Sequence, residues 1–150
     1  RLYRSLVVEN KLAVSAGSWY RAENIGPSVF GIYASPQDNI TIEKLEESIN
    51  RELHLVVNEG VSLKEVGDAK TRLRRSAVFA KDSVTAPARI IGSALATGQS
   101  IEEIESWPDR ISKVTREDVI AAAKSVLRMK HSLTAVLLPK IKISKKPGKI

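Results

Sequence analysis

The feature that most constrains this fold is a helix-start signal that recurs along the chain. A serine or threonine is followed three residues later by an acidic residue at Ser62 and Glu65, at Ser100 and Glu103, and at Thr115 and Asp118. At this spacing, each side chain of the pair can bond to the backbone N–H of the other in the first turn of a helix. The sequence therefore predicts a helix after each signal, and a helix-rich layer over residues 62–127.

Another helix is expected before these three. Thr41 can cap it, and its apolar residues recur at steps of three or four, at Ile42, Leu45, Ile49, Leu53 and Val56. Gly60 stands where a helix commonly ends. In the helix after Ser62 the predicted buried face consists of Val66, Ala69, Leu73, Ala77 and Ala80. Pro87 interrupts this pattern, so a further helix is expected from near Ser83 to before Gly98.

The first 40 residues change from helical spacing to the alternation of strands. A short helix is expected to end near Lys11, and "AVSAGSWY" and "SVFGIYAS" then alternate as two strands. Gly26 and Pro27 supply the turn chemistry between them. At the other end of the chain, "SLTAVLL" at residues 132–138 is predicted to be a strand bounded by Pro139. Trp107 and Pro108 are interpreted as a buried indole at a helix junction.

This order predicts an α+β fold, a two-layer sandwich with helices packed on one face of a mostly antiparallel sheet. Three strands make a thin sheet for so many amphipathic helices. We therefore expect a partial domain that lacks its first strand and helix. An open sheet edge or apolar patch would then favour a homo-oligomer or pairing with another half.

The composition suits one domain with one core, because 43% of the 150 residues are hydrophobic. No apolar run approaches the roughly 20 residues of a membrane span, and no secretion signal is recognisable. The chain has no cysteine, which excludes disulfides and thiolate metal sites and leaves the compartment, periplasm or cytoplasm, open.

The positive charge is concentrated at one end. Without the five lysines of residues 140–150, the net charge falls from +7 to +2. We expect residues 1–139 to be the domain and residues 140–150 to be a basic, flexible tail. Nucleic-acid binding by this tail is the less favoured alternative, because no aromatic stacking residues accompany the lysines.

The residues for common hydrolytic chemistry are missing. The chain has only two histidines, His54 and His131, and neither stands in a His-x-x-Glu-His pattern. His54 is expected to be a surface residue, and Lys130 next to His131 would oppose a metal ion. No serine stands in a Gly-x-Ser-x-Gly elbow. No catalytic and no metal-binding residue is predicted.

The ordered stretches "RLYRSLVVENKLAVSAGSWY", "GVSLKEVGDAKTRL", "ALATGQSIEEIESWPDRISKVTREDVIAAAKSVL" and "SLTAVLLP" resemble the C-terminal half of bacterial zinc peptidases of the insulinase, pitrilysin and mitochondrial processing peptidase family. The most specific parts are the stretch from Gly60 to Lys70 and "KVTREDV" at residues 113–119. The resemblance covers nearly all of residues 1–139.

This resemblance implies two similar domains that close around a chamber. The N-terminal domain of the family carries the inverted histidine motif, so zinc and the general base would belong there. The chain would then be the non-catalytic C-terminal domain of a zinc metalloendopeptidase. Its partners would be the catalytic domain or subunit and an extended peptide, which is expected to add as a strand to the other domain.

Two positions depart from the family pattern. Many members have Leu-Arg, five residues and then Ala-Tyr, and the Arg and Tyr can contact substrate backbone and the developing oxyanion. Leu6 and Ala13 align with this pattern, so Val7 and Val14 take the Arg and Tyr positions. They are substrate-contact candidates, and packing in the core explains them equally well. Their lack of polar groups keeps a second hypothesis open, an inactive subunit that pairs with a separate catalytic chain.

Overall fold

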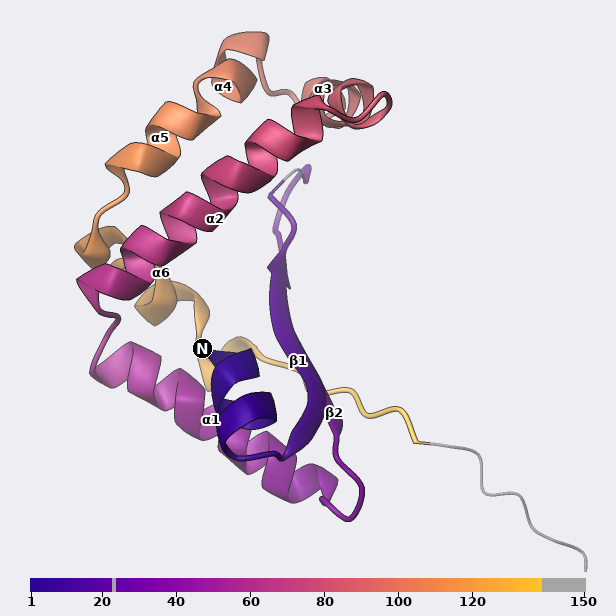
Figure 1. The fold of residues 1–150 in the computed structure, drawn as a ribbon, viewed down its shortest axis with the longest axis vertical. Coiled ribbons are helices and arrows are strands. Elements are labelled where there is room, and N and C mark those ends of the chain that lie inside the picture. The colour runs from indigo at the N-terminus through magenta and orange to yellow at the C-terminus, as the bar shows by residue number, and fades with distance from the viewer. Residues whose placement is uncertain (23, 139–150) are drawn as a thin grey trace, which may run out of the picture.

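The computed structural model describes residues 1–22 and 24–138, which form a helix-rich α+β fold with one β-hairpin (Figure 1). In chain order the elements are η1 (Arg4–Glu9), β1 (Ala13–Tyr20), β2 (Phe30–Pro36), α1 (Ile42–Asn58), α2 (Leu63–Lys81), α3 (Ala86–Ala96), α4 (Ile101–Glu105), α5 (Trp107–Lys113), α6 (Arg116–Val126) and η2 (Met129–His131). This confirms the predicted α+β class. The basic segment 140–150 lies outside the described residues.

The helices begin where the capping signals predict. Ser62, Ser100 and Thr115 each form a complete capping box with the acidic residue three positions later. Thr41 caps α1 by accepting a hydrogen bond from the N–H of Lys44. The helix α3 begins at Ala86, with Pro87 in its first turn, where the missing N–H of proline costs no helical bond.

The β-hairpin is antiparallel and places aromatic side chains over glycines. Trp19 is opposite Gly31 and Tyr33 is opposite Gly17 in the register. A Cβ atom added to Gly31 would overlap the Trp19 ring, and one added to Gly17 would overlap the Tyr33 side chain. The glycines therefore leave the space that these two aromatic side chains occupy.

The helices fold back on themselves beside the hairpin. In Figure 1, α1 lies next to η1 and the lower part of the hairpin, and α2 rises from the end of α1 towards α3. The helices α4 and α5 return alongside α2, and α6 lies near the corner between α1 and α2. Among the described residues, no helix combines the length and the apolar content that crossing a membrane requires.

The corner between α1 and α2 depends on Gly60, which has a φ of +81°. A Cβ atom here would lie 2.7 Å from Cδ1 of Ile120 in α6. Arg116, at the start of α6, donates its Nε–H to the backbone oxygen of Val61 at 2.5 Å. The corner is thus held against α6 by backbone shape, close packing and one hydrogen bond.

The main core is small and lies where η1, β1 and α1 meet. Its buried members are Leu6, Leu12, Ala13, Ala16 and Leu45. Val66 in α2 and Ala94 in α3 are buried outside this cluster. Much apolar surface elsewhere stays exposed, including Val78 and Phe79 on α2.

Three predictions about single elements are wrong or only partly right. Residues 132–138 form no strand, because no strand among the described residues pairs with them. Leu73, assigned to the buried face of α2, is 44% exposed, since α2 is covered only in part by its neighbours. Trp107 does stand at the junction of α4 and α5, but it is half-buried rather than buried.

Candidate functional site

The two valines that take the family's Arg and Tyr positions lie in different surroundings. Val7 is half-buried in η1 and packs against the main core. Val14 is 58% exposed on β1. The register of the hairpin shifts between Ala13 and Ser15, so Val14 lies in a β-bulge without a paired residue on β2. Bulges re-aim a side chain, and here the side chain presented to solvent is apolar.

The chemistry of these valines is limited to apolar contact. Their methyl groups neither donate hydrogen bonds nor stabilise a developing negative charge. The core packing proposed for Val7 is observed, whereas Val14 is available at the surface of the hairpin. Val14 can therefore make apolar contacts at the surface, but no polar ones.

A polar network lies next to Val7 that the sequence reasoning did not predict. The buried Ser5 donates its hydroxyl to Oε1 of Glu52 on α1 at 2.6 Å. Asn10 donates from Nδ2 to the backbone oxygen of Ser5 at 2.9 Å and to its Oγ at 3.2 Å. These bonds fix η1 on α1. A serine next to Leu6 on an apolar helix is the one sequence signal that could have indicated a buried hydrogen bond.

A hollow of about 730 Å³ lies between η1, α1, α2, α5 and α6. Its wall carries both signs of charge, with Arg1, Arg4 and Arg72 near Glu9, Glu52 and Glu65. Arg1 and Glu65 form an ion pair at 2.8 Å, and Arg4 pairs with Glu9 at 2.7 Å. Because these charges neutralise one another, the hollow has no concentrated charge to attract a ligand of one sign.

Glu65 is the titratable group in this hollow with the largest shift in pKa. The backbone N–H of Ser62 is the main cause that lowers the pKa of Glu65 from 4.5 to about 2, with further contributions from Arg1 and the Ser62 hydroxyl. Burial opposes this effect. The carboxylate is therefore held in its ionised form as a helix cap, which makes it unsuitable as a general acid at neutral pH.

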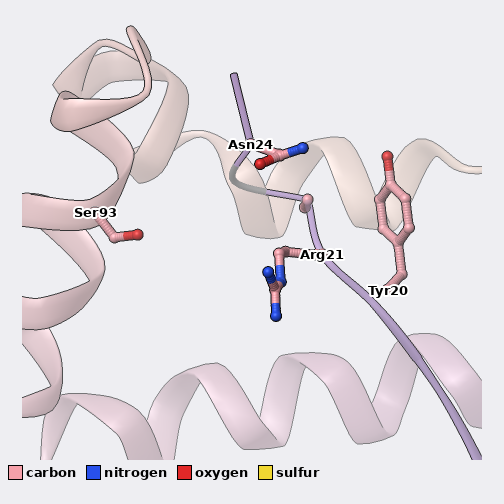
Figure 2. A pocket seen from close by; sticks show the side chains of 5 residues that line it. Tyr20, Arg21, Asn24 and Ser93 are labelled. Carbon is pink, nitrogen blue, oxygen red and sulfur yellow. The ribbon is translucent and has the colours of Figure 1, made fainter. Parts of the chain in front are cut away.

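A second hollow, of about 540 Å³, lies between the end of the hairpin and α3 (Figure 2). Tyr20, Arg21 and Asn24 line it from the hairpin side, and Ser93 lines it from α3. Figure 2 shows that these side chains point in different directions rather than towards one point. Arg21 instead lies over the Trp19 ring, 5.9 Å from its centroid. The arrangement lacks a nucleophile bonded to a base.

The metal donors among the described residues do not fit a zinc ion. His54 is exposed on α1 and His131 is exposed on η2. Over residues 1–22 and 24–138 no group of three or more histidine, aspartate and glutamate side chains is placed to hold a metal. No catalytic step is therefore derived through zinc in this chain.

Comparisons with known proteins agree with the sequence resemblance. Residues 1–73 match the family model described as the peptidase M16 inactive domain. A protease from Helicobacter pylori has a similar structure, with a TM-score of 0.73 and 16% identity over 84% of this chain and 30% of that one. A protein described as a "putative zinc protease" from Bordetella pertussis Tohama I is similar with a TM-score of 0.79 and 19% identity, over 93% of this chain and 75% of that one. No curated protein matches the sequence significantly.

The chain shares its α+β fold with these two structures, and at 16% and 19% identity the likeness concerns the fold alone. The match to the peptidase M16 inactive domain covers residues 1–73, which is just under half of the 150-residue chain. The chain spans 30% of the length of the Helicobacter pylori protease.

Proposed function

We propose that this chain forms the non-catalytic wall of the chamber of a zinc-dependent metalloendopeptidase. The observation that carries the proposal is the match of residues 1–73 to the inactive domain of the family. Zinc, the general base and the bond cleavage belong in this proposal to a catalytic N-terminal domain.

The partners follow from the same proposal. The catalytic domain closes against this one, and an extended peptide is held between them. Residues 1–139 act as the domain and residues 140–150 as a basic tail outside it. Val14, exposed on the β-bulge, contacts an apolar side chain of the peptide, while Val7 supports the corner from inside.

The test is reconstitution from two separately purified polypeptides. One is this chain, and the other is the part of the parent protein that carries the inverted histidine motif. We expect a fluorogenic peptide to be cleaved only when both are present, and a zinc chelator to abolish the cleavage. Zinc measured by atomic absorption should accompany only the catalytic half. A His54→Ala, His131→Ala double variant of this chain should reconstitute as well as the natural sequence.

Two results would contradict the proposal. One is stoichiometric zinc in this chain that is lost in the double histidine variant. The other is peptide cleavage by this chain alone after contaminating enzymes have been removed.

The valines at positions 7 and 14 favour a second candidate, an inactive subunit that completes the chamber of a separate catalytic chain. Such a subunit needs no groups that contact the oxyanion. The two candidates differ in whether the catalytic domain lies on the same polypeptide as this one. An inverted histidine motif on the same polypeptide would exclude the separate subunit.

A further inference from the structure

We draw no further inference here: the strongest candidate, the exposed aromatic face of the β-hairpin where Trp19 and Tyr33 lie over glycines of the opposite strand, carries no proposal because nothing in the structure shows what covers it.

Discussion

The carboxylate of Glu65 connects the start of the chain to the start of α2. It accepts hydrogen bonds from the Ser62 N–H at 2.8 Å and from the Ser62 hydroxyl at 2.9 Å. Arg1 donates to it from Nε at 2.9 Å and from Nη2 at 3.0 Å. A single side chain therefore caps a helix and fixes a residue 64 positions away in the sequence.

We expect Glu65→Gln to make the stability of the protein less dependent on pH. The folded pKa of Glu65 is lowered from 4.5 to about 2, so its contribution is complete above pH 4.5 and is lost as the pH falls towards 2. The amide can still cap α2, but it lacks the charge that favours Arg1 and the helix N-terminus. At pH 7 the variant should lose about 1 kcal/mol of unfolding free energy, measured by urea denaturation.

Glu47→Gln is the matched control, because Glu47 is exposed on α1. Its unfolding free energy should stay within about 0.5 kcal/mol of the natural protein between pH 2 and pH 7. If Glu65→Gln showed the same loss at pH 2 as at pH 7, the cap would not be acting through its charge.

At the residue scale, sequence patterns predicted local partners and missed distant ones. The spacing of Ser62 and Glu65 is itself the capping signal, so that contact could be predicted. Arg1 carries no signal that it would reach Glu65, because long-range pairs depend on how the helices fold back. The cover of Gly31 by Trp19 was missed for the same reason, since it requires the exact register of the hairpin.

Among the elements, α3 differs from α2, α4 and α6 at its start. Thr115 accepts a hydrogen bond from the Asp118 N–H at 3.1 Å, and Asp118 accepts one from the Thr115 N–H at 2.8 Å. Thr85 stands at the same position before α3, but its side chain makes no capping bond and its backbone is helical. The same residue type therefore occurs with and without a cap.

We expect Thr115→Ala to destabilise the protein by about 1 kcal/mol, because it leaves an N–H of α6 without its partner. Urea unfolding followed by circular dichroism measures the change. Thr85→Ala should change the unfolding free energy by less than about 0.5 kcal/mol, since no cap is lost. Equal losses in the two variants would show that threonine contributes through something other than its capping bond.

Most elements could be predicted because their signals are local. The hairpin strands are marked by alternation, and the three capping boxes mark helices within one turn of their starts. The segment 132–138 shows the limit of this reasoning. Its composition is typical of a strand, but a strand also needs a neighbour, and composition carries no information about that neighbour.

For the whole molecule, the main core is the factor that limits stability. Leu6 is the one large side chain that is essentially inaccessible among the described residues, with 1% exposure. It joins η1 to β1 and α1 through the cluster that contains Leu12 and Leu45. Because so few side chains are buried, the loss of one removes a large fraction of the total free energy of unfolding.

We expect Leu6→Ala to lower the unfolding free energy by about 3 kcal/mol, through lost burial and the cavity that remains. Thermal unfolding should show a lower midpoint or no cooperative transition. Val8→Ala on the same element is the control, because Val8 is exposed and should cost less than about 0.5 kcal/mol. A mild effect of Leu6→Ala would mean that stability resides in the helices α2 to α6 instead.

The overall class could be predicted from the order of elements, but the path of the helices could not. The predicted buried face of α2 is partly exposed at Leu73, because the helices that return along α2 cover only one side of it. The surroundings of the candidate site residues could not be predicted from the sequence either. Val7 and Val14 follow from the Leu-Arg and Ala-Tyr pattern of the family, whereas the exposure of Val14 depends on the β-bulge, for which no residue pattern gives a signal.

The corner at Gly60 implies that position 60 cannot change even when the distant residue that it faces changes as well. A side chain at position 60 would meet both an unfavourable backbone angle and the end of the Ile120 side chain. Shortening residue 120 would remove only the second obstacle. Related sequences that fold this way should therefore keep glycine at this corner even where the residue facing it on α6 varies.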